Sequence, residues 1–106
     1  MDDYTEMRED TKRRVLEMVD KLPDEPFCRW VLDIPGIYFV LRGAEVSYVG
    51  STQSMRQRWV QQPLRNAVDS GMLTLRYKRP ASPKKKARLR EEAFFISVLQ
   101  PKLNSL

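Results

Sequence analysis

The segment between Pro35 and Gly50 limits most strongly what this chain can fold into. Two short runs of β-branched, aromatic and apolar residues, 37–41 and 46–49, are separated by a polar turn over residues 42–45. Runs of this length and composition are typical of strands, and so short a connection joins antiparallel neighbours. We therefore expect a β-hairpin, with the rest of the chain packed against it.

Patterns on either side of the hairpin predict a small α+β arrangement. Residues 5–22 and 84–100 are helix-like, the first with apolar positions at three- and four-residue steps and the second stopped by Pro101. Residues 73–77 are β-rich and predict a third strand. Ser54 is placed to cap a helix that runs to Gln62, residues 64–68 add a further helical stretch, and residues 27–32 are expected to be extended.

Composition bounds the class of protein. A chain of 106 residues with 42% hydrophobic and 31% charged residues is ordinary for one globular domain. Its apolar runs are too short to cross a bilayer, and the lone Cys28 excludes an intrachain disulfide, which fits a cytoplasmic, intracellular protein. The sequence holds no histidine, so any catalysis must use tyrosine, lysine, arginine or carboxylate side chains.

Positive charge is concentrated in one stretch. The formal net charge is +5, and residues 75–90 contain no acid but carry the basic side chains Arg76, Lys78, Arg79, Lys84, Lys85, Lys86, Arg88 and Arg90. Such a run suits a polyanion such as a nucleic-acid backbone. A solvated loop and first helical turn would account for the charge equally well.

One carboxylate, Glu92, falls within the apolar stripe of the last helix, which is formed by Leu89, Phe95, Ile96 and Leu99. A carboxylate there loses hydration unless a cation, a metal ion or hydrogen-bond donors face it. An ion pair with Arg88 or Arg58 is the structural alternative to a functional site. Glu91, by contrast, is expected to point towards solvent.

Five separated elements form a recognisable order. Gly36-Ile37-Tyr38 and Tyr48-Val49-Gly50 are nine residues apart, and they are followed by Arg58-Trp59, by residues 92–96 and by residues 100–104. Together they resemble the GIY-YIG nuclease family over roughly two-thirds of the chain. On this basis we expect an N-terminal helix and linker over residues 1–34 and a nuclease domain over residues 35–106.

The resemblance implies a three-stranded antiparallel sheet flanked by helices, and hydrolysis of phosphodiester bonds in DNA repair, homing, restriction or mobile-element contexts. Carried over by position, the catalytic set is Tyr38, Tyr48, Arg58, Glu92 and Asn104. Glu92 would hold Mg²⁺ or Mn²⁺, a role that suits a hard cation that keeps most of its waters. Arg58 offers a planar fork for phosphate oxygens.

The tyrosines and Asn104 would complete this chemistry. Tyr38 could accept a proton from water where cationic neighbours favour its phenolate, and Tyr48 would orient the attacking water. Asn104 would fix a neighbouring group by hydrogen bonding. Packing on a half-buried sheet is the structural alternative for both tyrosines.

Two positions depart from the family pattern, and both are candidates for supporting roles. Gln62 stands where many members have histidine, and it cannot act as a base near neutral pH. Ser51 stands where the excinuclease-like branch often has lysine. Both changes leave the proton pathway undefined.

A shared site requires Tyr38 and Tyr48 to project from one face of the hairpin. Because side chains alternate along a strand, pairing Arg42 with Val46 around a three-residue loop puts both phenols on one face. Pairing Arg42 with Glu45 around a two-residue turn puts them on opposite faces. We therefore expect the odd-length loop.

The leading interpretation is a metal-dependent DNA endonuclease that is a monomer or weak dimer and that grips the backbone through the basic run with little sequence preference. Specificity would then come from DNA shape or from a protein partner, and RNA is an alternative substrate. A non-catalytic nucleic-acid-binding module of the same fold is the second interpretation, favoured by Gln62. A protein-interaction adaptor that uses the N-terminal helix is the third.

Overall fold

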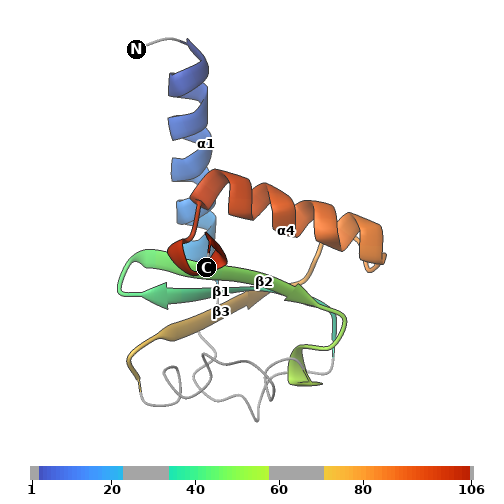
Figure 1. The fold of residues 1–106 in the computed structure, drawn as a ribbon. Coiled ribbons are helices and arrows are strands. Elements are labelled where there is room, and N and C mark those ends of the chain that lie inside the picture. The colour runs from blue at the N-terminus through green and yellow to red at the C-terminus, as the bar shows by residue number, and fades with distance from the viewer. Residues whose placement is uncertain (1–2, 23–33, 58–70, 106) are drawn as a thin grey trace.

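The computed structural model describes residues 3–22, 34–57 and 71–105. The elements are α1 (Asp3–Asp20), β1 (Gly36–Arg42), β2 (Glu45–Thr52), β3 (Thr74–Lys78), α4 (Lys85–Leu99) and the 3-10 helix η2 (Lys102–Ser105). The strands form one antiparallel sheet in the order β2-β1-β3, and α1 and α4 lie on the same face of it (Figure 1). The expected three-stranded antiparallel sheet with flanking helices is therefore confirmed.

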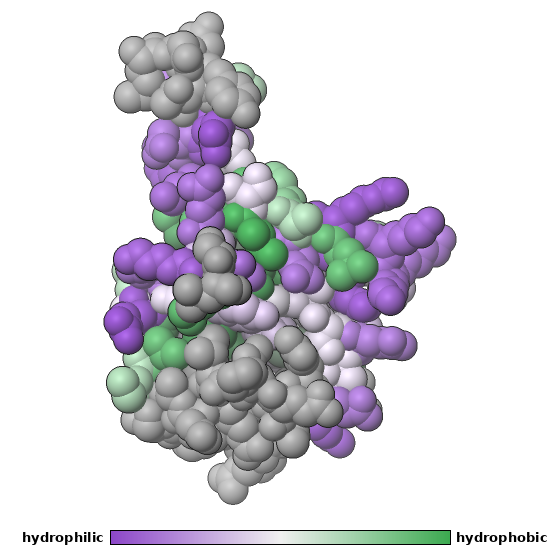
Figure 2. Space-filling model, viewed as in Figure 1, coloured by the Kyte–Doolittle hydropathy of each residue, from purple (hydrophilic) through white to green (hydrophobic). Residues whose placement is uncertain are grey.

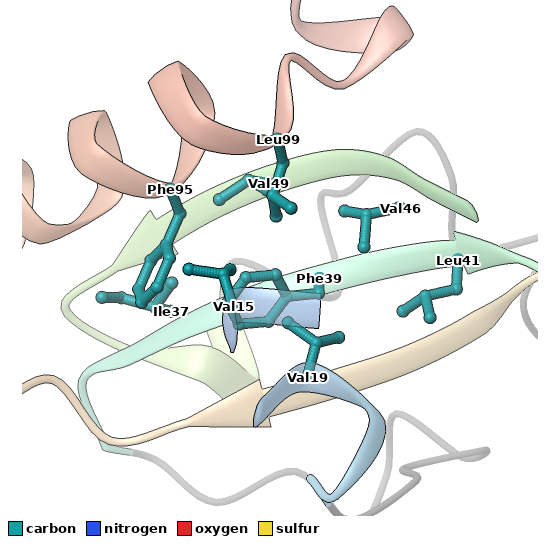
Figure 3. Packing of buried hydrophobic residues seen from close by; sticks show 9 residues of the cluster. All are labelled: Val15, Val19, Ile37, Phe39, Leu41, Val46, Val49, Phe95 and Leu99. Carbon is teal, nitrogen blue, oxygen red and sulfur yellow. The ribbon is translucent and has the colours of Figure 1, made fainter. Parts of the chain in front are cut away.

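The helix-covered face of the sheet holds the larger hydrophobic cluster (Figure 3). The central strand points Ile37, Phe39 and Leu41 at this face, and the ring of Phe39 meets the edge of Phe95 from α4 with centroids 5.3 Å apart. The other buried members are Val15 and Val19 of α1, Val46 and Val49 of β2, and Leu99 of α4. Burial of these apolar side chains fixes both helices to the sheet.

The opposite face of the sheet carries a smaller cluster. Tyr38 and Val40 of β1 pack there with Leu75 of β3 and with Met55. Since successive residues of a strand point to opposite faces, β1 is buried on both sides, and residues 37–41 are no more than 4% exposed. An almost wholly apolar central strand follows from this position.

The hairpin turn differs from the predicted loop. Arg42 pairs with Glu45 across a two-residue turn, so the expected three-residue loop is wrong. The register then shifts: Val40 pairs with Tyr48 and Leu41 with Val46, which leaves Ser47 without a partner on β1. This β-bulge adds one residue to β2 and changes the alternation that follows, so Tyr48 lies on the same face as Tyr38.

The other predicted segments that fall within the described residues agree with the observed elements to within about three residues, which is the usual uncertainty of a predicted boundary. Ser54 acts as a helix cap, because its hydroxyl oxygen accepts a hydrogen bond of 3.3 Å from the Gln57 amide. Residues 27–32 and 64–68, and the helix beyond Gln57, lie outside the described residues. Within the described ranges, no helix is long and apolar enough to span a membrane.

Deleting Ser47 tests the role of the bulge. The deletion removes the extra residue while Val46 still faces Leu41 and Tyr48 still faces Val40, so we expect a folded protein with both tyrosines on one face. Deleting Val49 instead has the same length but turns Tyr48 towards the helix-covered core, and this should strongly lower the unfolding midpoint in urea. Equal loss of stability in the two deletions would contradict the role given to Ser47.

Candidate functional site

Three tyrosines lie on the sheet face opposite the helices. The rings of Tyr38 and Tyr48 are 6.0 Å apart between centroids and are tilted by 35°. Tyr77 of β3 is the cross-strand partner of Tyr38 and belongs to the same cluster. Tyr38 is only 1% exposed, whereas Tyr48 and Tyr77 are half-buried. Of the two tyrosines in the motif, Tyr48 is therefore the one that remains accessible.

Tyr38 passes directly over Gly50 of β2. A Cβ atom at position 50 would lie 2.4 Å from the phenol oxygen of Tyr38 and 2.4 Å from the ring carbon that carries it. Contacts this short do not occur between real atoms, so only glycine fits beneath the ring. The glycine of the second half-motif is therefore required by the tyrosine of the first, and the phenol oxygen of Tyr38 lies at the edge strand.

Glu92 meets the same strand from the helix-covered side. It is half-buried on α4, and the hydroxyl of Ser51 donates a hydrogen bond to its Oε2. From the sequence we expected the Glu92 carboxylate to need a cation, a metal ion or a hydrogen-bond donor, and Ser51 is such a donor. The alternative ion pair with Arg88 does not occur among the ion pairs of the described residues.

Asn104 fastens the C-terminal 3-10 helix to the outer edge of β2. Its Oδ1 accepts a hydrogen bond of 2.9 Å from the Val49 amide, and its Nδ2 donates one of 2.9 Å to the Val49 carbonyl. β2 is an edge strand, so these two backbone groups have no strand partner on that side. Asn104 therefore positions the strand that carries the site, through its backbone.

Three of the predicted side chains thus meet three consecutive residues of β2. Asn104 binds Val49, Tyr38 covers Gly50, and Glu92 accepts from Ser51. The phenols lie on the sheet face opposite the helices, whereas Glu92 reaches the edge strand from the helix-covered face. Arg58 and Gln62 fall outside the described residues.

The predicted nucleic-acid-binding residues divide into two groups. Arg76 donates a hydrogen bond of 3.0 Å to the Val19 carbonyl and also binds the Asp20 carbonyl, so it caps the C-terminus of α1. Lys78 forms an ion pair with Glu91, and Arg88 is 6% exposed. The exposed members are Arg79, Lys84, Lys85 and Lys86.

Glu91 does not point towards solvent, so that expectation is wrong. Its Oε2 binds Lys78, and its Oε1 accepts a hydrogen bond of 2.9 Å from the Ala81 amide. Lys78 also lies 5.9 Å from the centroid of the Phe95 ring. Glu91 therefore ties the loop after β3 to α4, and a helical wheel cannot predict this because the loop comes from outside the helix.

The acidic side chains of the described residues are compatible with a Mg²⁺ site of one protein ligand but not with a structural zinc site. In the described parts of the chain, no group of three or more His, Cys, Asp or Glu side chains could hold a metal. A structural zinc site needs four such ligands, so the described residues do not fit one. Mg²⁺ is commonly bound through one or two carboxylates while it keeps several waters, and Glu92 fits that requirement.

Sequence reasoning missed Tyr77. Leu73, Leu75 and Tyr77 alternate with polar residues, which indicates one shared face of β3. The alternation does not say which strand lies beside β3. Only the pairing of β3 with β1 places Tyr77 next to Tyr38.

Substituting Gly50 by alanine tests the close approach of Tyr38. We expect Gly50→Ala to lower the free energy of unfolding by about 1–3 kcal/mol, because the new Cβ overlaps a buried ring. The loss should largely disappear in the double variant with Tyr38→Leu, measured by urea denaturation. Gly43→Ala is the control: its backbone has φ 61° and nothing lies within 4 Å of the new Cβ, so its loss of about 1–2 kcal/mol should not respond to Tyr38→Leu. Additive losses for Gly50→Ala and Tyr38→Leu would refute the contact.

The fold is similar to that of known nuclease domains. Two solved structures of the GIY-YIG N-terminal endonuclease domain of UvrC from Thermotoga maritima, both point mutants bound to the catalytic divalent cation, match with a TM-score of 0.57. Each match covers 71% of this chain and 87% of the other, at 16% and 15% sequence identity. No family model matches the sequence, and no curated protein matches it. The structural likeness establishes that the chain has the fold of a GIY-YIG endonuclease domain.

Proposed function

We propose that this chain is a metal-dependent DNA endonuclease that hydrolyses phosphodiester bonds with low intrinsic sequence specificity. The observation that carries the proposal is that Tyr38 and Glu92 contact the consecutive residues Gly50 and Ser51 of the strand that also carries Tyr48. The likeness to endonuclease domains that bind a catalytic divalent cation supports the same reaction class.

Glu92 is the proposed ligand for Mg²⁺ or Mn²⁺. The Ser51 hydroxyl holds one carboxylate oxygen, Oε2, and so orients the group and leaves Oε1 to face the ion. When bound, the ion would supply Lewis-acid stabilisation of the negative charge that develops on the phosphate and on the leaving oxygen. In this scheme Ser51 is a positioning residue.

Tyr48 is the proposed partner of the attacking water. A group that takes or orients a proton must reach it, and Tyr48 is half-buried while Tyr38 is 1% exposed. We therefore keep Tyr48 in the water-facing role expected from the sequence, and we no longer assign proton acceptance to Tyr38. Tyr38 then backs the Tyr48 ring and fills the space above Gly50.

The remaining requirements are a phosphate-binding cation and a grip on the DNA. Arg58 is proposed for the first role on its place in the motif alone. Arg79, Lys84, Lys85 and Lys86 are exposed along the loop after β3 and the start of α4, and we propose that they contact backbone phosphates. Since phosphate contacts carry no sequence information, DNA shape or a protein partner would set the target.

Replacing one carboxylate and not its neighbour tests the metal-dependent reaction. The protein is incubated with single-stranded, duplex and branched DNA and with matched RNA, in the presence of Mg²⁺ or Mn²⁺. Reactions with EDTA serve as the blank. We expect Glu92→Gln to lose at least about 100-fold in cutting rate. Glu91→Gln changes the next residue, which binds Lys78 and Ala81, and it should keep most of the activity. DNA binding by the wild type without any cutting would favour the non-catalytic module, and preferred cutting of RNA would overturn the choice of substrate.

A pair of phenylalanine variants tests this assignment of roles to the two tyrosines. Tyr48→Phe removes the accessible hydroxyl and should lower the single-turnover rate by about 100-fold or more. Tyr38→Phe keeps the ring over Gly50 and should lose less. The assignment fails if Tyr38→Phe is the more damaging change while both variants melt like the wild type.

A further inference from the structure

The first turn of α4 has none of the groups that usually neutralise a helix N-terminus. Lys84 occupies the cap position without a side-chain hydrogen bond, and the first turn contains no acidic residue. Instead, Lys84, Lys85 and Lys86 are all exposed there. A helix N-terminus carries partial positive charge and unpaired amide groups, so lysines at this end repel it and leave an anion-binding position.

Arg88 is an independent sign of an anion-binding position at the same place. It is 6% exposed, its Nε is buried without a hydrogen-bond partner, and the ion pairs of the described residues do not include it. Its amide donates to the Lys84 carbonyl at 3.0 Å, which places it in the first turn. Because helical side chains incline towards the N-terminus, we expect the Arg88 guanidinium to be directed to the same end of the helix. A buried, unpaired guanidinium is costly and is well suited to a phosphate.

The surroundings of this turn are held in place. Glu91 binds both Lys78 and the Ala81 amide, and the Ser82 hydroxyl accepts a hydrogen bond of 3.3 Å from the Lys84 amide. The loop that leads into α4 is therefore fastened to the helix itself. Hydrophilic side chains project from this end of α4, at the right of Figure 2.

We propose that the first turn of α4 and Arg88 form a binding site for a second backbone phosphate, separate from the phosphate that is cut. This inference rests on the proposed nuclease function and adds the path of the DNA strand. Seven residues separate Lys85 from Glu92, which corresponds to about 10 Å along the helix. At about 3.4 Å per nucleotide along one strand, the anchored phosphate lies about three nucleotides from the cut.

A scan with neutral phosphates tests this site. Branched DNA from the cutting assay, whose junction fixes one binding register, carries a single methylphosphonate that is moved one linkage at a time. Each DNA is bound to the wild type in EDTA, and the cut position is read from a separate Mg²⁺ reaction. We expect one linkage, about three nucleotides from the cut, to weaken wild-type binding about tenfold when neutralised. The Arg88→Gln variant should bind that oligonucleotide and the unmodified one with affinities within about twofold of each other. For this variant, the slope of log binding constant against log salt concentration should also be smaller than that of the wild type by about one.

Two further variants keep the test decisive. Lys85→Ala changes an exposed side chain of the same turn and should reduce the penalty at the same linkage if Arg88→Gln fails to fold. Lys12→Ala, an exposed lysine on α1, should leave the whole scan unchanged. A penalty that persists in Arg88→Gln and Lys85→Ala, or a flat scan in a wild type that cuts DNA, overturns the second site and leaves the nuclease proposal standing. A single penalised linkage that both variants abolish, in a protein that cuts DNA with neither Mg²⁺ nor Mn²⁺, supports the phosphate site and overturns the nuclease proposal.

Discussion

The contact between the Tyr38 ring and Gly50 is the constraint on which the rest of the site depends. The ring occupies the place of a side chain on the edge strand, so the phenol oxygen lies at the sheet edge and not in the middle of the sheet. Asn104 holds the preceding residue from outside, and Glu92 meets the following one from the helix-covered face. Each contact limits where β2 can move, so the strand that presents the site is held from three directions.

The two faces of the sheet differ in composition. Its helix-covered face is an apolar cluster that includes Phe39, Phe95 and Val49, and it accounts for the attachment of α1 and α4. Its other face combines the phenols of Tyr38, Tyr48 and Tyr77 with the aliphatic side chains of Val40 and Leu75. A single-residue bulge at Ser47 makes this division possible with a two-residue turn, because it brings Tyr48 to the phenolic face while Val46 and Val49 stay in the core.

The sequence predicted the elements well because each depends on local pattern. Residues 37–41 are apolar throughout, as a strand buried on both faces requires, and the long C-terminal helix ends next to Pro101. The predicted three-residue loop was wrong because Ser47 carries no signal of a bulge. Side-chain alternation requires one extra residue to bring both tyrosines to one face, and this residue lies in the strand and not in the turn. The motif singled out Glu92 and Asn104, and the structure shows that they form hydrogen bonds with Ser51 and Val49, which are far away in sequence.

Charge was harder to interpret than hydrophobicity. A run of basic residues predicts a polyanion partner, but alternation along β3 turns Arg76 and Lys78 towards the helices, where backbone carbonyls and Glu91 bind them. The same alternation is visible in the sequence once the strand is recognised, so this division could have been predicted. The burial of Arg88 could not, because it depends on how the start of α4 packs on the rest of the domain.

The position of a bound Mn²⁺ ion tests the central claim most directly, since Mn²⁺ broadens the NMR signals of nearby nuclei. In a titration of the wild type, we expect the amides of Gly50, Ser51 and Glu92 to broaden first, and Glu92→Gln to abolish this effect. The exposed acids of α1, among them Glu6 and Glu9, are the competing site. Broadening centred on α1, with Ser51 and Glu92 unaffected, would contradict a metal site at the edge of β2.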